Sequence, residues 1–137
     1  MNKNHLYAFY GSLRAGMYNN NRFSASGMQQ LGSTIISGFR LYSLGSYPCV
    51  VRTGDDADKV TVDLFSVTGE TESRIHHMEI GAGYEYEEIR IESPIEEING
   101  KEFGIYTFDT SALGRLKDRY VPGGDWVKHL QPTNESR

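Results

Sequence analysis

The chain has 137 residues, of which 38% are hydrophobic and 23% charged, so it can bury a core and is too apolar to be largely disordered. Its formal net charge of −4, without any basic cluster, argues against a nucleic-acid partner. No apolar run could span a bilayer, and the N-terminus lacks the apolar stretch of a signal peptide, so we expect a protein without membrane contact. The single cysteine cannot form an internal disulfide, which favours a cytoplasmic location.

The first predicted element is a strand over residues 6–10, which runs directly into a glycine-containing turn. Five consecutive apolar or aromatic residues predict a strand that is buried on both faces. Gly11 then allows either a tight turn or the close approach of a ligand. Backbone N–H groups of Gly11, Ser12 and Leu13 would have no ladder partner and could bind a carboxylate or a polarised carbonyl. From these residues alone, a ligand-binding loop and a plain turn both stay open.

Hydrophobic periodicity and turn residues predict the other elements in chain order. Helices are predicted over residues 20–31, 68–79 and 111–120, with a final helical turn over 126–130. Strands are predicted over residues 34–44, 49–51, 59–67, 84–92 and 101–108. Gly38 predicts a bend in the first of these, and the Asn99-Gly100 pair predicts a hairpin turn before the last.

Strands therefore outnumber helices, and short helices interrupt them irregularly. This pattern predicts an α+β fold, either a small mixed β-barrel or a strongly bent sheet with short flanking helices. The chain contains neither an internal repeat nor an interdomain linker. We expect residues 1–130 to form a single domain and residues 131–137 to be a flexible tail.

Glu79 is the most informative ionisable residue. It lies at the end of the helix predicted over residues 68–79, with apolar side chains on both sides. Poor solvation there, together with the negative end of the helix dipole, would raise the pKa of the carboxyl towards that of a general base. A solvated glutamate at a helix end is the alternative that the residues leave open.

Other reactive residues give weaker signals. His76 and His77 are adjacent and point in different directions on a helix, so they do not form a metal-binding pair, and we expect them to be surface or packing residues. Cys49 follows a proline at a strand start with no base beside it, which favours an inert buried thiol. We therefore expect no metal site.

Several motifs recur together, in one order, along nearly the whole chain. They are Tyr10-Gly11-Ser12-Leu13 followed by Arg14, Gly16 and Asn19; Gly38-Phe39-Arg40-Leu41-Tyr42; Tyr47-Pro48; Ile75-His76-His77-Met78-Glu79; Tyr86; and Gly124-Asp125-Trp126. In order and spacing they resemble the gamma-glutamylcyclotransferase-like family, especially its gamma-glutamylamine cyclotransferase and avirulence-induced-gene branch.

The resemblance implies a compact β-barrel with flanking helices and a cavity at its mouth. The implied reaction is an intramolecular attack of the α-amine of a gamma-glutamyl compound on its own γ-carbonyl, which releases an amine and 5-oxoproline. Glu79 would be the catalytic base, and the amides of Gly11, Ser12 and Leu13 would hold the substrate. Tyr10 and Tyr86 would line the cavity. The substrate would be a small molecule, and the reaction would need no cofactor.

The chain also departs from the family pattern close to Glu79. Ile80 replaces a glycine, His76 replaces an aspartate, and Glu87 and Glu88 stand where arginines are common. Because of these changes, a protein that binds a small metabolite in the same cavity without turnover is an alternative. A protein-interaction role for the acidic segment 85–97 is a third possibility, against the simpler interpretation of a solvated strand edge.

Overall fold

The computed structural model describes residues 5–15, 17, 20 and 27–130. The strands are β1 (Leu6–Phe9), β2 (Met28–Ser37), β3 (Phe39–Ser43), β4 (Pro48–Arg52), β5 (Lys59–Val67), β6 (Glu85–Arg90) and β7 (Glu102–Thr107). The helices are α2 (Gly69–Gly81), α3 (Leu113–Leu116) and α4 (Trp126–Leu130), with 3₁₀ turns at Thr110–Ala112 and Lys117–Arg119. In this part of the chain, no helix has the length and apolar character needed to cross a membrane.

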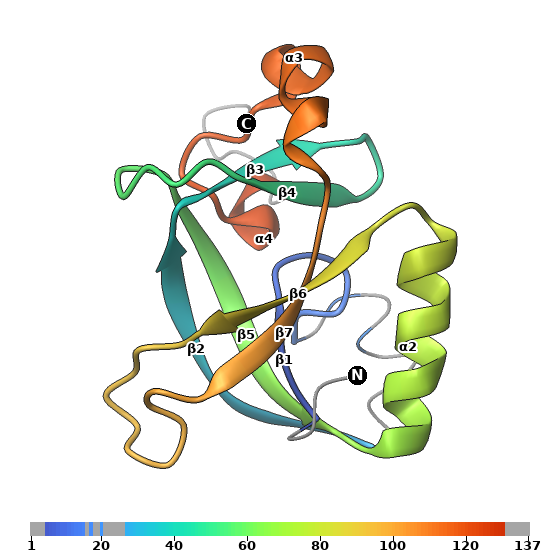
Figure 1. The fold of residues 1–137 in the computed structure, drawn as a ribbon, viewed down its shortest axis with the longest axis vertical. Coiled ribbons are helices and arrows are strands. Elements are labelled where there is room, and N and C mark those ends of the chain that lie inside the picture. The colour runs from blue at the N-terminus through green and yellow to red at the C-terminus, as the bar shows by residue number, and fades with distance from the viewer. Residues whose placement is uncertain (1–4, 16, 18–19, 21–26, 131–137) are drawn as a thin grey trace, which may run out of the picture.

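The strands form a five-stranded sheet in the order β2-β5-β1-β7-β6 and a separate β3–β4 pair (Figure 1). Strands β1 and β7 pair in parallel, whereas the other neighbours are antiparallel. This confirms the α+β class. Because β2 and β6 remain as edges of the sheet, the described residues form no closed barrel, and the barrel alternative is not supported.

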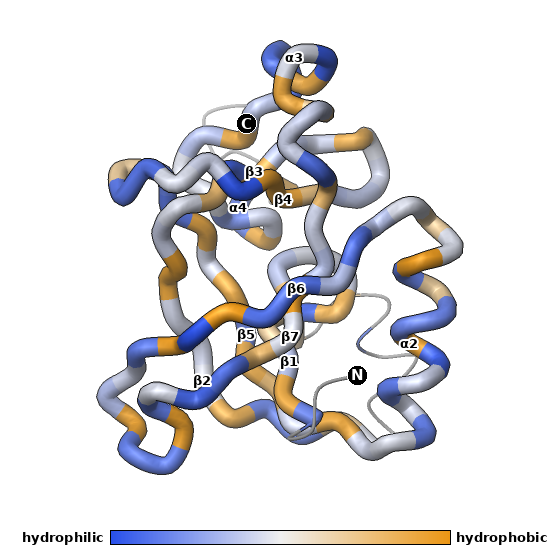
Figure 2. Tube along the Cα trace, in the orientation of Figure 1, coloured by the Kyte–Doolittle hydropathy of each residue, from blue (hydrophilic) through white to orange (hydrophobic). Residues whose placement is uncertain are grey.

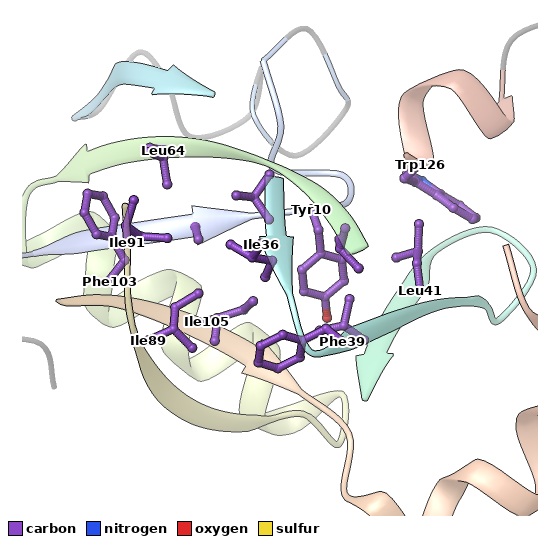
Figure 3. Close-up of a cluster of buried hydrophobic side chains, with 14 of the residues drawn as sticks. Tyr10, Ile36, Phe39, Leu41, Leu64, Ile89, Ile91, Phe103, Ile105 and Trp126 are labelled. Atoms are coloured by element: carbon purple, nitrogen blue, oxygen red, sulfur yellow. The ribbon is translucent and has the colours of Figure 1, made fainter. Parts of the chain in front are cut away.

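Strand β1 is buried on both faces, as its unbroken apolar sequence predicts. Leu6 and Ala8 belong to one hydrophobic cluster, and Tyr7 and Phe9 belong to another. The first cluster, drawn in Figure 3, also contains Trp126 of α4, so the C-terminal part of the chain packs on this side of the sheet. Strand β1 is therefore held between two cores, which fixes the point where the following turn leaves the sheet.

Helix α2 packs against the second cluster. Its residues are mainly hydrophilic, with a few hydrophobic ones in its second half (Figure 2), and Ile75 is the apolar residue it buries in that cluster. Acidic Glu70 and Glu72 in the first turn favour the start of the helix. At its end the chain reverses at Gly83, which has φ of 97°. The last turn of α2, which contains Glu79, therefore lies close to the start of β6.

The helix predicted over residues 20–31 is wrong in its second half, because Met28 begins the ten-residue strand β2. Residues 21–26 lie outside the described residues. Strand β2 pairs with β5 along its whole length, from Met28 opposite Val67 to Ser37 opposite Lys59. This extended pairing outweighs the weak helical pattern of the sequence.

Two other predictions change in detail. The strand predicted over residues 34–44 is split at Gly38, whose φ is 87°, so β2 and β3 join different sheets. Asn99-Gly100 lies near the end of the eleven-residue connection between β6 and β7 rather than forming a two-residue hairpin turn. The predicted tail, residues 131–137, lies outside the described residues.

Candidate active site

A cavity of about 270 Å³ opens between the turn after β1, the last turn of α2 and the starts of β4 and β6. Its described lining residues are Ala8, Phe9, Tyr10, Gly11, Ser12, Leu13, Tyr47, Pro48, Met78, Glu79, Ala82, Tyr84 and Tyr106. The structure thus brings Tyr10–Leu13 and Glu79 together, although almost seventy residues separate them in the sequence. Most of this lining is apolar or aromatic.

Glu79 is the only carboxylic side chain among the described lining residues. Burial raises the pKa of the Glu79 carboxyl to about 7. No hydrogen bond or ion pair to this carboxylate is found in the described part of the chain, so nothing there offsets its poor solvation. A carboxyl with a pKa near neutrality and no internal partner is suited to taking and returning a proton.

Three tyrosines form a wall around Glu79. Tyr10 donates a hydrogen bond of 2.6 Å to the carbonyl of Tyr106, and Tyr84 donates one of 2.5 Å to the carbonyl of Pro48. Burial raises the pKa of all three hydroxyls, and the negative charge of Glu79 contributes to each rise. The hydroxyls therefore stay neutral, and the wall excludes water while its polar atoms are satisfied.

The turn after β1 lies directly against Pro48. A Cβ atom on Gly11 would be 2.8 Å from the Pro48 Cγ atom, so glycine is required for this close approach. Gly11 and Leu13 have no hydrogen-bond partner for their amides among the described residues. Both line the cavity, which leaves their N–H groups as candidate donors to a ligand.

We expect Gly11→Ala to lower activity strongly, because the added methyl group must displace Pro48 or the turn itself. A loss of about 10-fold or more in kcat/KM is the expected size, since small displacements of binding groups are costly. Gly114→Ala is the matched control, because a Cβ atom there meets no atom within 4 Å and the φ of Gly114 is not positive. Equal activity of wild type and Gly11→Ala would contradict the assigned role of this contact.

A buried ion network anchors the other end of the turn. Arg14 lies 3.3 Å from Asp63 of β5 and donates a 2.8 Å hydrogen bond to Asp125, which precedes α4. Asp63 also accepts a hydrogen bond from the amide of Ala15. Arg14 and Asp63 are 8% and 4% exposed. The turn is thereby fixed to both the sheet and the C-terminal segment, which connects two of the motifs noted in the sequence.

The family described as "Gamma-glutamyl cyclotransferase, AIG2-like" matches residues 7–128. The chain belongs to this family. The match includes every residue named around the cavity. Comparison with curated protein sequences gives no significant match.

Solved structures share the fold of this chain. An uncharacterized protein, PH0828, from Pyrococcus horikoshii is 25% identical, with 90% of this chain and 91% of that chain covered and a TM-score of 0.69. An AIG2-like protein from Mus musculus is 16% identical, with coverage of 95% and 97% and a TM-score of 0.71. Protein ytfP from Escherichia coli is 23% identical, with coverage of 92% and 99% and a TM-score of 0.62. The last two likenesses show the shared fold.

Tyr86, predicted from the resemblance to line the cavity, is not among its described lining residues. Its ring packs edge-on against Tyr7 and Tyr106, and its hydroxyl donates to Glu88 at 2.8 Å. Tyr84 lines the cavity instead. In the strand predicted over residues 84–92 the two tyrosines would point to the same face, so the sequence alone could not choose between them. In the structure Tyr84 precedes β6 and lies outside it.

The positions at which the chain departs from the family pattern lie outside the described lining of the cavity. Ile80 is 44% exposed on α2. Glu87 pairs with Arg52 on the surface, at 2.8 Å, and accepts a hydrogen bond from Thr107. Glu88 is exposed on the edge strand β6. The changes at Ile80, Glu87 and Glu88 therefore alter the surface near the cavity. His76 differs from them, because it is half-buried and its Nδ1 lies 3.1 Å from the hydroxyl of the lining residue Tyr106.

Two remaining candidates have structural explanations. Cys49 is fully buried, and burial raises the pKa of its thiol to about 12, as expected of an unreactive cysteine. Within the described ranges, no group of three or more His, Cys, Asp or Glu side chains could hold a metal ion. Among the described lining residues, Glu79 is the carboxylic group whose pKa is raised to near neutrality.

We expect the raised pKa of Glu79 to make the native protein less stable as pH rises. The folded chain holds this proton up to about pH 7 and the unfolded chain only to about 4.5, so stability falls between these values. Glu79→Gln removes the buried charge. At pH 8 it should exceed the wild type in free energy of unfolding by about 1–3 kcal/mol, with no difference below about pH 4.5. Urea titrations at several pH values measure this, and a constant difference would contradict it.

Proposed function

We propose that this protein is a cofactor-independent gamma-glutamylamine cyclotransferase with Glu79 as its general base. The observation that carries the proposal is the position of a carboxyl with a pKa of about 7 in the same cavity as the Gly11–Leu13 turn. Membership of the AIG2-like gamma-glutamyl cyclotransferase family supports the reaction type.

The reaction is an internal aminolysis. Glu79 takes a proton from the substrate α-ammonium group, and the freed amine attacks the γ-carbonyl carbon. A new C–N bond closes a five-membered ring, the ring nitrogen gives up a second proton, and the original amide C–N bond breaks. The leaving amine takes up both protons, the first of them returned by Glu79, and departs as an ammonium ion. Donors on the Gly11–Leu13 turn stabilise the substrate carboxylate or the developing oxyanion. Because both reacting groups belong to one molecule, the cavity mainly has to fold and hold it.

A second opening lies beside the cavity, and Tyr47 and Ala82 line both. Its lining differs in character, because it includes Glu85, Asp109 and Arg115. Charged groups at this position suit a polar leaving amine better than an alkyl one. We therefore place the γ-glutamyl part of the substrate in the first cavity and the leaving amine towards the second.

Release of 5-oxoproline from a panel of γ-glutamyl amines and γ-glutamyl amino acids tests the proposal. The expected result is turnover of at least one compound without added metal or cofactor. The alternative, a protein that binds without turnover, predicts thermal stabilisation by these compounds but no product. The departures from the family pattern at Ile80, Glu87 and Glu88 favour this binding alternative. Because these residues lie outside the cavity lining, their support for it is weak.

The third possibility concerned the acidic segment 85–97. Its exposed glutamates lie on β6, which is an edge of the sheet, and in the connection to β7. Charge on an exposed edge prevents unwanted strand pairing, so these residues have a sufficient structural role without a partner protein.

A further inference from the structure

Helix α2 carries three ionisable residues on the face that it turns towards the sheet. Glu72, His76 and Glu79 are spaced by four and three positions, which places them along one side of the helix. Glu72 is 1% exposed, and the other two are half-buried. Glu72 and His76 form hydrogen bonds with tyrosines of the sheet, and Glu79 lies in the cavity.

The first connection is at the start of the helix. The Glu72 carboxylate accepts a 2.5 Å hydrogen bond from the Tyr7 hydroxyl of β1, and its other oxygen lies 2.7 Å from Nδ1 of His5. One helical turn later, Nδ1 of His76 lies 3.1 Å from the Tyr106 hydroxyl of β7. The rings of Tyr7 and Tyr106 stack at 5.9 Å between centroids, with an angle of 8° between their planes. Helix α2 is thus fastened to two adjacent strands at two successive turns.

Tyr106 joins this arrangement to the cavity. Its carbonyl accepts the hydrogen bond from Tyr10, at the start of the turn that is proposed to bind the substrate. Its side chain is close enough to Glu79 for that charge to contribute to the raised pKa of the Tyr106 hydroxyl, after burial. One residue therefore contacts the binding turn through its backbone and the helix of the general base through its hydroxyl.

The end of α2 is capped by its own backbone. Glu79 lies two residues before the end of the helix, and the carbonyls of residues 78–80 accept hydrogen bonds from the amides of residues 82–84. These bonds are local and do not join the helix end to the sheet. The chain then passes through three exposed residues, 81–83, before β6. Terminal turns of this kind fray readily, so the last bond to the sheet before Glu79 matters most for its position. That bond is the one between His76 and Tyr106.

We propose that His76 and Tyr106 are positioning residues that fix the Glu79 carboxylate against the substrate held by the turn at residues 10–13. This inference rests on the proposed function of the cavity. The hydroxyl–imidazole bond holds the last turns of α2 at a fixed distance from β7, and a shift of about 1 Å at a reacting group can cost about 100-fold in rate.

Tyr106→Phe and His76→Leu test this directly, since the first removes only a hydroxyl. Each should lower kcat for 5-oxoproline release by about 10- to 100-fold while KM changes less than about 3-fold. The double variant should be no worse than either single one, because both remove the same bond. His76→Gln, whose amide can bond the hydroxyl, should recover most of the lost kcat.

Matched controls of the same residue types are available, one on α2 and one outside the sheet. His77→Leu changes the exposed neighbour of His76, and Tyr120→Phe removes the hydroxyl of a tyrosine that is 41% exposed. Both should keep wild-type kcat. Variants of His76 and Tyr106 that keep wild-type kcat would overturn the proposal. So would parallel losses of kcat, substrate affinity and thermal stability, which indicate general disruption of packing.

A second measurement does not depend on turnover. Amide hydrogen exchange at residues 79–84 should be faster in Tyr106→Phe than in wild type or His77→Leu, because α2 loses the side-chain hydrogen bond to the sheet that lies nearest Glu79. Unchanged exchange would overturn the proposal. Absence of 5-oxoproline release by the wild type would instead refute the proposed function, so the two failures are distinguishable.

Discussion

Glu79→Gln should lower kcat for 5-oxoproline release by about 10²- to 10⁴-fold, the range expected for loss of a general base. Glutamine has nearly the same shape as glutamate, but its side-chain amide neither accepts nor releases a proton near neutral pH. In the wild type, kcat/KM should rise with pH through about 7 as Glu79 loses its proton, and this rise should vanish in the variant. Rates are measured across pH 5–9.

Glu70→Gln is the matched control, because Glu70 lies on the same helix but is exposed in its first turn. We expect it to keep wild-type kcat and the wild-type pH profile. A Glu79→Gln protein as active as the wild type would remove Glu79 from the mechanism, whatever the substrate.

The second large effect is expected from Arg14→Met. This change leaves Asp63 and Asp125 facing each other without the cation between them, in a site where Asp63 is 4% exposed. Removing one partner of a buried ion network typically destabilises by about 3–5 kcal/mol. Urea unfolding should show a loss of this size, and activity should fall with it, because the turn that lines the cavity is anchored through Arg14.

Arg52→Met provides the contrast. Arg52 pairs with Glu87 at a similar distance, 2.8 Å, but its side chain is 49% exposed. Exposed ion pairs are worth about 0.2–1 kcal/mol, so the variant should lose little stability. Similar losses of stability from Arg14→Met and Arg52→Met would mean that burial of the Arg14 network does not increase its contribution to the free energy of unfolding. Adding Asp63→Asn to Arg14→Met should restore part of the stability, since it removes the uncompensated charge.

The local signals that were strong in the sequence predicted the corresponding elements well. The apolar run at residues 6–10 predicted a strand with two buried faces, and β1 is buried throughout. The helix predicted over residues 68–79 corresponds to α2 within two residues. In both cases, the pattern within the segment and its contacts with the rest of the chain favour the same structure.

The first half of β2 was not predictable in this way. Nothing within residues 28–31 favours a strand over a helix, and what decides is the antiparallel pairing with β5, more than thirty residues later. Sequence patterns report local preference, whereas this pairing is a property of the assembled sheet.

The site was predicted in part. Glu79 and the Tyr10–Leu13 turn were chosen from the sequence, and the structure places them in one cavity. The Arg14–Asp63–Asp125 network was missed. Asp63 alternates with Val62 and Leu64, a pattern typical of a strand with one solvated face, but residues on both faces of β5 are buried. The sign of a buried ion network is a charged residue inside a strand that is covered on both faces. Whether a strand is covered on both faces is known only from the tertiary structure.

A crystal structure of the protein with bound 5-oxoproline tests the central claim most directly. We expect the ring to occupy the cavity, with its nitrogen within hydrogen-bond distance of the Glu79 carboxylate and an oxygen on the amides of Gly11 or Leu13. A carboxylate turned away from the bound product, or 5-oxoproline bound elsewhere while the cavity stays empty, would contradict the account.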